Sequence, residues 1–339
     1  MTANVALVGY GLAGSVFHAP FIATTPGLRL SVVVTGDERR REQALREHPS
    51  VDVVGTADEV WERAPELDVA VIATPNDSHA RLGLAALEAR LAVVVDKPLA
   101  LNAVEGARLV DAAAERRLML TVFQNRRWDG DFLTLRRLLE ASELGRVHRF
   151  ESRFERWRPK VGDGWRERRP PEEGGGLLLD LGSHLVDQAL QLFGPARGLY
   201  AEVDARREGA VADDDVFLAL EHESGVRSHL WASVLAAEPG PRFRVLGDRA
   251  AFVKEGLDVQ EERLRAGRSP TDPGWGEEPR ERWGRLVVGE AERDVPTEPG
   301  SYEAFYAGVV ASLNDGAPPP VDPRDAVAVL ELLDEARAG

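Results

Sequence analysis

The feature that most constrains the fold lies near the start of the chain, where an apolar run leads into three closely spaced glycines. Residues 5–8 are Val-Ala-Leu-Val, and Gly9, Gly11 and Gly14 follow in a G-x-G-x-x-G pattern that includes Leu12 and Ala13. The pattern is typical of a buried strand that turns sharply into a helix and binds a dinucleotide. Gly9 would allow the tight turn, Gly11 would let backbone N–H groups approach a pyrophosphate, and Gly14 would bring helix and strand together. A glycine turn without a ligand is the alternative for the pattern taken alone.

Strand and helix patterns alternate through the first 123 residues. The expected strands are residues 3–8, 28–34, 51–54, 68–73, 92–95 and 118–123, with helical patterns between them at 14–24, 38–47, 57–63, 76–89 and 102–116. The strands are short and rich in valine, as in strands buried on both faces. This alternation predicts a doubly wound α/β sheet of parallel strands with helices on both faces. We therefore expect residues 1–123 to form a Rossmann dinucleotide-binding domain.

The rhythm changes after residue 123. Helical patterns are expected at 132–141, 181–193, 302–314 and 324–337, and strand patterns at 146–158, 198–206, 215–221, 226–234, 242–247 and 250–254. Residues 160–176 and 268–285 have the proline, glycine and charged composition of loops. Short turns between successive strands favour a largely antiparallel sheet. We expect residues 124–339 to form an α+β domain that binds substrate and mediates oligomerisation.

A ligand of an open parallel sheet lies beyond the carboxyl ends of its strands, so residues at those ends are candidates for the cofactor site. Asp37 follows the second strand, 23 residues after Gly14, where a carboxylate would meet the adenosine ribose. Arg39, Arg40 and Arg41 come next, and they could bind a 2′-phosphate or form a solvated helix face. Asp37 favours NAD as the cofactor, with NADP as the second candidate.

The fourth and fifth strands also end in polar residues. Thr74, Asn76 and His79 follow the fourth strand. Asn76 is suited either to cap the next helix or to face the nicotinamide ribose. Lys97 follows four apolar residues of the fifth strand and is itself followed by a proline, which places its ammonium group at the carboxyl edge of the sheet. Together with Asn125 after the sixth strand, these residues are the remaining expected cofactor contacts.

A second polar cluster follows three consecutive glycines at 174–176. Asp180, His184 and Asp187 recur at i, i+4 and i+7, so one helical face would carry all three among leucines. Carboxylates and imidazoles in apolar surroundings are costly unless they are paired or used. The structural alternative is that Asp180 caps the helix and Asp187 satisfies His184.

The ordered set of these motifs resembles the Gfo/Idh/MocA family of glucose–fructose oxidoreductases, inositol dehydrogenases and rhizopine-catabolism proteins. The motifs are G-Y-G-L-A-G at 9–14, T-P-N-D-S-H at 74–79, D-K-P at 96–98 and G-G-G-L-L-L-D-L-G-S-H-L-V-D at 174–187. Within the family, residues 123–134, 165–167 and 256–262 look like the scyllo-inositol 2-dehydrogenase branch. The chain departs from many members in having Asp96, where they have glutamate, before the lysine.

The resemblance implies a nicotinamide-dependent dehydrogenase acting on a cyclic polyol or sugar, with Lys97, Asp180 and His184 as the catalytic group. Histidine is suited to take the hydroxyl proton near neutral pH, and a lysine ammonium would stabilise the developing alkoxide. Asp180 would orient the substrate. Contacts to its ring are expected from the catalytic group and from Asn125, Arg127, Trp165 and Arg166.

Composition excludes several other classes of function. The 42 basic and 57 acidic side chains give a net charge of −15, which disfavours nucleic acid and anionic membranes as partners. The chain has no cysteine, so disulfides and thiolate chemistry are excluded, and its seven histidines show no close zinc-binding pair. No signal or membrane-spanning pattern is present, so we expect a cytoplasmic protein, as a homodimer or homotetramer.

Two alternative functions remain open at this point. One is NAD-dependent glycosidase chemistry on the same fold, in which the hydride is borrowed and returned. The other is a sensor that binds the cofactor and a protein partner without catalysis, although a sensor would not need Lys97, Asp180 and His184 together.

Overall fold

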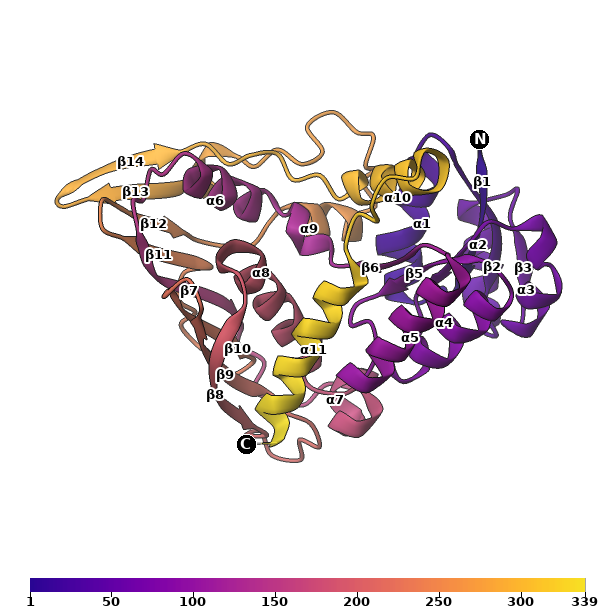
Figure 1. Ribbon diagram of the computed structural model, residues 1–339, viewed down its shortest axis with the longest axis horizontal. Helices are drawn as coiled ribbons and strands as arrows, with labels where there is room; N and C mark the ends of the chain where they lie inside the picture. Colours follow the sequence, from indigo (N-terminus) through magenta and orange to yellow (C-terminus); the bar gives the residue numbers. More distant parts are fainter. Residues whose placement is uncertain (339) are drawn as a thin grey trace. The chain divides into compact units, whose positions relative to one another are not determined.

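The computed structural model of the chain describes residues 1–338 (Figure 1). The chain folds into two compact units. The first contains Met1–Asn125, Glu262–Trp275 and Tyr302–Ala328, and the second contains Arg126–Glu261, Gly276–Ser301 and the residues from Val329 onward. Both units are therefore assembled from segments that are far apart in the sequence.

A six-stranded parallel sheet forms the centre of the first unit (Figure 1). Its strands are β1 (Ala3–Val8), β2 (Leu28–Val34), β3 (Asp52–Val54), β4 (Val69–Ile72), β5 (Ala92–Asp96) and β6 (Leu120–Phe123), in the order β3-β2-β1-β4-β5-β6. Every strand pair in this sheet is parallel. The order reverses between β1 and β4, which is the position where ligands of doubly wound sheets bind. The predicted α/β fold class is confirmed.

Helices of the first unit connect successive strands, except for α10 (Glu303–Asp315), which follows β14 (Ala291–Val295) in the chain. They are η1 (Ala13–His18), α1 (Ala19–Thr24), α2 (Glu38–Glu47), α3 (Asp58–Glu62), η2 (Ala64–Glu66), η3 (Asn76–Ser78), α4 (His79–Glu88), α5 (Ala103–Arg116) and α10 (Glu303–Asp315). Side-chain caps fix two of their starts, because Asp37 accepts from the Arg40 N–H and Asn102 from the Glu105 N–H. The predicted helix at 14–24 is divided at His18, where a π-helix gives way to an α-helix whose first turn contains Pro20.

The second unit is built on an eight-stranded sheet. Its strands are β7 (Val147–Glu155), β8 (Ala196–Asp204), β9 (Asp215–His222), β10 (Arg227–Ser233), β11 (Phe243–Gly247), β12 (Ala251–Lys254), β13 (Gly284–Val288) and β14 (Ala291–Val295). The order is β14-β13-β12-β11-β7-β10-β9-β8, and only the β10–β7 pair is parallel. The predicted, largely antiparallel sheet is confirmed, and its one parallel pair arises because β7 pairs on one side with β11 and on the other with β10.

Most helices of the second unit are short. They are η4 (Asn125–Trp128), α6 (Gly130–Glu140), α7 (Trp165–Arg168), η5 (Pro171–Glu173), η6 (Leu178–Gly182), α8 (Ser183–Phe193) and η7 (Arg280–Arg282), and α9 (Gln260–Arg265) and α11 (Pro323–Ala338) occur where the chain passes between units. Helix α8 packs on β7 and β10 (Figure 1). The interpretation of 160–176 as a loop was incomplete, since α7 and η5 form within it. Helix α9 and the β13–β14 hairpin were not predicted.

No helix within residues 1–338 combines the length and apolar character needed to cross a membrane. Across the same residues, no group of three or more histidine, aspartate or glutamate side chains is arranged to hold a metal ion.

Candidate active site

The glycine turn after β1 has almost no room for side chains. Gly9 has a φ of +102°, and a Cβ there would lie 2.6 Å from the carbonyl oxygen of Ala73. A Cβ on Gly14 would lie 2.0 Å from the carbonyl oxygen of Gly9, so helix and strand approach each other as closely as the backbone permits. Gly11 differs, because a Cβ there would meet only the Arg40 Nη1, at 3.8 Å. The turn therefore has an open side at Gly11, which is where a pyrophosphate would approach in a dinucleotide fold.

The three arginines after β2 have different surroundings. Arg41 donates from Nη1 to the carbonyl oxygen of Val53 at 2.8 Å and so ties α2 to β3. Arg40 is exposed, and its guanidinium lies beside the open side of the glycine turn. Asp37 accepts the backbone N–H of Arg40 at 3.1 Å, as the cap of α2. Of the three arginines, Arg40 is the one placed to meet a ligand at the turn.

The end of β4 is organised by hydrogen bonds to its own turn. The hydroxyl groups of Thr74 and Ser78 are 2.6 Å apart, and Asn76 is buried at the start of η3. The fully buried His79 lies with Nε2 2.9 Å from the carbonyl oxygen of Thr74 and Nδ1 2.7 Å from that of Pro98. His79 thus joins the turn after β4 to the turn that carries Lys97.

Asp96 holds the other side of the Lys97 turn. Its Oδ1 accepts the backbone N–H of Lys97 at 2.9 Å and lies 3.7 Å from Nε2 of the fully buried His18. Nδ1 of His18 is 2.6 Å from the hydroxyl oxygen of Tyr306 on α10. Burial raises the pKa of Asp96, but His18 and the charges of Lys97 and His79 outweigh it and hold that pKa below its usual range. The carboxyl group beside Lys97 is therefore ionised near neutral pH.

In the second unit, Asp180 lies in the π-helical turn that precedes α8. Its Oδ1 is 3.1 Å from the Arg166 Nε, and the Arg166 guanidinium lies 4.5 Å from the Trp165 ring centroid. His184 is buried at the start of α8, with its ring 6.3 Å from that of Phe154. The structure thus brings Trp165, Arg166 and Asp180 together within one unit. Lys97 belongs to the other unit, and its meeting with Asp180 and His184 on one substrate stays a prediction.

The glycines before this turn are needed for the packing of the chain on itself. A Cβ on Gly175 would lie 1.9 Å from the carbonyl oxygen of Arg169, and one on Gly176 would lie 2.0 Å from Oδ1 of Asp213. Oδ2 of Asp213 accepts the Leu178 N–H at 2.6 Å and so holds the start of η6. These contacts give a structural reason for the glycine run that sequence reasoning had connected with a bound molecule.

A buried Arg207 supports the α7 segment. It donates from Nε to Asp214 at 2.8 Å and from Nη1 to Glu167 at 2.8 Å. Nη1 also donates to the carbonyl oxygen of Lys160 at 3.0 Å. Trp165 and Arg166 therefore stand on a turn whose position is fixed by charged hydrogen bonds.

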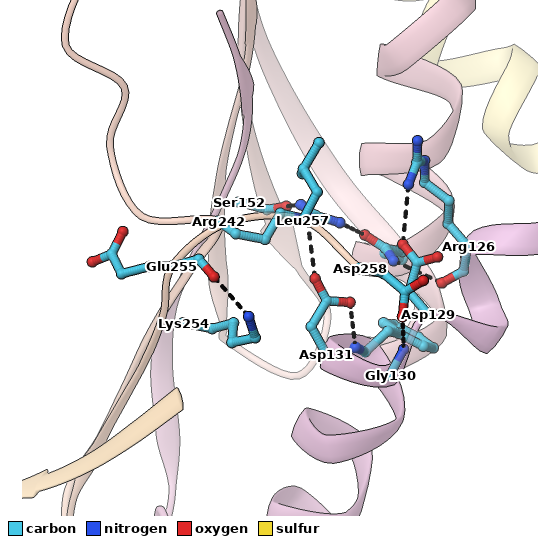
Figure 2. Close-up of polar contacts among 12 residues, drawn as sticks. Arg126, Asp129, Gly130, Asp131, Ser152, Arg242, Lys254, Glu255, Leu257 and Asp258 are labelled. Carbon is cyan, nitrogen blue, oxygen red and sulfur yellow. Dashed lines mark hydrogen bonds and ion pairs between the residues drawn. The ribbon is translucent and has the colours of Figure 1, made fainter. Parts of the chain in front are cut away.

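The residues after β6 form a second polar network, and Figure 2 shows the part of it around Arg126 and Asp129. Arg126 contacts Asp129 at 3.2 Å and Glu261 at 2.9 Å. The neighbouring Arg127 donates two hydrogen bonds to Asp187 on α8, at 2.9 and 2.6 Å. The sequence suggested Arg127 as a substrate contact. In the structure its side chain stabilises the position of α8 through Asp187.

Asp258 is buried beside this network (Figure 2). It accepts the N–H groups of Gly130 at 2.8 Å and Gln260 at 2.7 Å. Burial, with the charge of Asp131 as the second cause, raises the pKa of Asp258 to about 6 against these hydrogen bonds. Asp131 in turn lies 3.5 Å from the Nε of the buried Arg242.

Sequence reasoning missed several residues that organise the site. His18, Tyr306, Asp213, Arg207 and Asp258 are all buried. The available signal was a polar residue inside an apolar pattern, such as His18 in Val-Phe-His-Ala-Pro. That signal does not identify a partner that is far away in the chain.

A doubly wound sheet with a tight glycine turn at its switch point is typical of NAD(P)-binding oxidoreductases. Residues 3–124 match the oxidoreductase family with an NAD-binding Rossmann fold, and residues 132–253 match the GFO/IDH/MocA C-terminal domain. The chain belongs to the Gfo/Idh/MocA family of oxidoreductases.

Individual relatives match over nearly the whole chain. The uncharacterized oxidoreductase YdgJ of Escherichia coli is 41% identical, over 98% of this chain and 94% of its own length. The scyllo-inositol 2-dehydrogenase (NADP(+)) IolW of Bacillus subtilis is 34% identical, over 99% of this chain and 93% of its own length. The solved structure of the oxidoreductase yvaA from Bacillus subtilis superposes with a TM-score of 0.93 at 34% identity, covering 99% of this chain and 95% of that one.

Proposed function

We propose that this oxidoreductase transfers a hydride between NAD(P) and a ring hydroxyl group of a cyclic polyol or sugar, with scyllo-inositol as the favoured substrate. The observation that carries the proposal is the setting of Lys97. The turn that carries it is held by Asp96 at the Lys97 N–H and by His79 at the Pro98 carbonyl oxygen, at the same sheet edge as the glycine turn. A relative that is 34% identical over its length is named a scyllo-inositol 2-dehydrogenase, which supports this substrate class.

The glycine turn fits a dinucleotide, because its backbone is bare at Gly9 and Gly14 and open at Gly11. The pyrophosphate would be held by the glycine turn, which consists of Gly9, Gly11, Leu12, Ala13 and Gly14. The part of the site that takes the nicotinamide would be lined or shaped by Thr74, Asn76, His79, Lys97 and Asn125. A bound nicotinamide would supply the acceptor for the hydride of the substrate carbon.

The other steps belong to side chains of the protein. His184 takes the proton of the reacting hydroxyl group, a task suited to an imidazole near neutral pH. The ammonium group of Lys97 stabilises the negative charge that develops on that oxygen. Asp180, held by Arg166, orients the ring and excludes misaligned binding, and Trp165 offers an apolar face to the ring carbons.

We further propose that the preferred cofactor is NADP. Asp37, which favoured NAD in the sequence, accepts a backbone N–H as a helix cap, whereas Arg40 faces the open side of the glycine turn. A guanidinium at this point suits a 2′-phosphate better than a ribose hydroxyl. The 34% identical relative is named as an NADP(+) enzyme, which agrees with this assignment.

Absorbance of the reduced nicotinamide, measured across a panel of inositols and sugars with each cofactor, tests the function. We expect stoichiometric NADPH formation with a free cyclic polyol. Lys97→Met should lower kcat about 100-fold or more, whereas Lys160→Met, at an exposed lysine, should leave it unchanged. Net hydrolysis of a glycoside without NADPH accumulation would instead support the glycosidase alternative. Cofactor binding without turnover, unaffected by Lys97→Met, would support the sensor.

The outer face of the eight-stranded sheet supports a homo-oligomer. Buried and partly exposed residues alternate along β9, and Phe217 lies on the partly exposed side with its ring 5.1 Å from that of Trp231 and 6.3 Å from that of Tyr200. Clustered aromatic side chains are enriched in protein interfaces. We expect light scattering to give a dimer or tetramer and Phe217→Glu to shift it toward monomer. Val288→Glu, at an exposed residue of β13, is the control.

A further inference from the structure

We propose that Asp96 is a positioning residue that holds the Lys97 ammonium group charged and in place, and that His18 and Tyr306 fix Asp96 for this task. The proposal rests on the proposed function, in which Lys97 contacts the reacting oxygen. It concerns a buried chain of three polar side chains, of which His18 and Tyr306 have no part in the mechanism above.

The first link is between Asp96 and the Lys97 turn. Oδ1 of Asp96 accepts the backbone N–H of Lys97 at 2.9 Å, so the carboxylate closes the turn at the end of β5. Only 7% of Asp96 is exposed, so water cannot readily replace the Lys97 N–H as the hydrogen-bond partner of the carboxylate. The turn is therefore held in the conformation that keeps this hydrogen bond. A shift of the carboxylate would move the residue that carries the ammonium group.

The second link fixes the carboxylate itself. His18 presents Nε2 to Oδ1 of Asp96 at 3.7 Å, and its Nδ1 lies 2.6 Å from the hydroxyl oxygen of Tyr306. A carboxylate only accepts, so the Nε2 that faces Asp96 is a nitrogen that carries a hydrogen, and Nδ1 shares a second hydrogen bond with the Tyr306 hydroxyl group. The ring of Phe123, 4.5 Å from that of His18, packs against the imidazole. The imidazole is thus held by packing on its ring and by a hydroxyl group on its far nitrogen.

The third link is electrostatic. The titratable groups that act on Asp96 come from four elements: Lys97 directly after β5, His18 at the end of η1, His79 at the start of α4, and Tyr306 on α10. Burial, and then the charge of Asp96, raises the pKa of Tyr306 well above its usual value, so the phenol stays protonated. A negative charge with little exposure to water therefore lies beside Lys97, whose own charge in turn helps to lower the pKa of Asp96. Opposite charges in such a setting stabilise each other's ionised forms.

The composition of the chain makes this inference directly measurable. It contains only three lysines, Lys97, Lys160 and Lys254. In protein labelled with 13C-lysine, the three Cε resonances can be followed through a pH titration without cofactor or substrate. Asp96→Asn keeps the shape of the side chain and an acceptor for the Lys97 N–H, and removes the charge.

We expect the titration midpoint of the Lys97 Cε resonance to fall in Asp96→Asn, because a neighbouring opposite charge has been lost. Lys160 is exposed, and Lys254 pairs with Glu278 at 3.0 Å. The titration midpoints of these two resonances should therefore be the same in Asp96→Asn as in the unmodified chain. In turnover, the same variant should lower kcat about ten-fold or more with the KM for cofactor within two-fold, and Asp96→Glu should restore most of kcat.

An unchanged Lys97 midpoint in folded Asp96→Asn would overturn the proposal, as would equal movement of all three lysines. If Asp96→Asn does not fold, the Asp96→Glu and Asp96→Gln pair repeats the comparison of a charged with a neutral side chain, and equal Lys97 midpoints overturn it there. Because the titration needs no turnover, it stays decisive even if no polyol is oxidised. A failure to oxidise any polyol would contradict the proposed function, and the Lys97 titration would still test the coupling of Asp96 to Lys97.

Discussion

Arg127 holds Asp187 through two hydrogen bonds, from Nε to Oδ2 at 2.9 Å and from Nη2 to Oδ1 at 2.6 Å. The side chains are 11% and 3% exposed. Asp187 is one helical turn beyond His184, so this pair connects the segment after β6 to the helix that carries the proposed proton acceptor. A bidentate guanidinium–carboxylate pair fixes distance and orientation together.

Breaking this pair should cost much of the protein's stability. We expect Arg127→Met or Asp187→Asn alone to lower the free energy of unfolding by about 3–5 kcal/mol, since each leaves a buried charge without its partner. Urea unfolding of both single variants and the double variant measures the coupling, and the double variant should lose clearly less than the sum. The exposed Arg136–Glu140 pair, 3.8 Å apart, is the control and should couple by less than about 1 kcal/mol. Strictly additive losses for Arg127 and Asp187 would contradict the expectation.

The glycine turn gives a prediction about cofactor binding. A methyl group at Gly14 would lie 2.0 Å from the Gly9 carbonyl oxygen, so Gly14→Ala must displace the turn from β1. We expect the Kd for NADPH, from fluorescence titration, to rise at least about ten-fold. Gly55→Ala is the matched control, because a Cβ there meets only the Glu59 Oε1 at 3.5 Å. Equal affinities of the two variants would show that the turn does not bind the cofactor.

Arg40 should decide between the two nicotinamide cofactors. Arg40→Ala is expected to raise the KM for NADP about ten-fold or more and to leave the KM for NAD within two-fold, because only NADP carries the 2′-phosphate. Steady-state kinetics with both cofactors measures the ratio. Arg39→Ala, at the exposed neighbouring residue, should leave it unchanged. A larger loss with NAD than with NADP would reverse the assignment.

Asp258 should lower the free energy of unfolding as pH rises, which is opposite to the usual effect of an aspartate. Its folded pKa of about 6 is above the unfolded value of 3.8, so the folded state binds the proton more tightly. Its contribution is greatest below pH 4 and is lost as pH rises through 6, by about 3 kcal/mol in all. Asp258→Asn removes this loss. The difference in Tm between the variant and the unmodified chain should therefore shift in favour of the variant as pH rises from 4 to 7.

The control for this experiment is Asp163→Asn, since Asp163 lies in an exposed ion pair with Arg168. Its Tm should follow that of the unmodified chain at every pH. Parallel Tm curves for Asp258→Asn as well would mean that Asp258 does not titrate in this range.

Much of the first unit could be predicted because its strands are valine-rich runs between glycine, proline and capping residues. The predicted strand at 28–34 matches β2 to the residue, and the glycine turn is where the spacing indicated. The β13–β14 hairpin was not predicted from the sequence, because β14 is a charged edge strand, Ala-Glu-Arg-Asp-Val, without alternating apolar residues.

The candidate site could be predicted only where its residues follow one another in the sequence. Lys97 and Asp180 are found from the strand end or helix face that carries them. The partners that hold them come from elsewhere: Tyr306 contacts His18 across 288 residues, and Arg127 contacts Asp187 across 60. Local periodicity has no information about such pairs, because they depend on how the elements pack.

The contact of His18 with Tyr306 has a consequence for any attempt to use the nucleotide-binding part as a building block. Tyr306 and its neighbour Phe305 form part of the aromatic packing around Phe123, and all of them are buried. A fragment cut after Asn125 would lack these rings and would expose His18 and Phe123 to water. Transplanting the first 125 residues into a chimera should therefore give an aggregating product, unless the segment 302–328 is grafted with them.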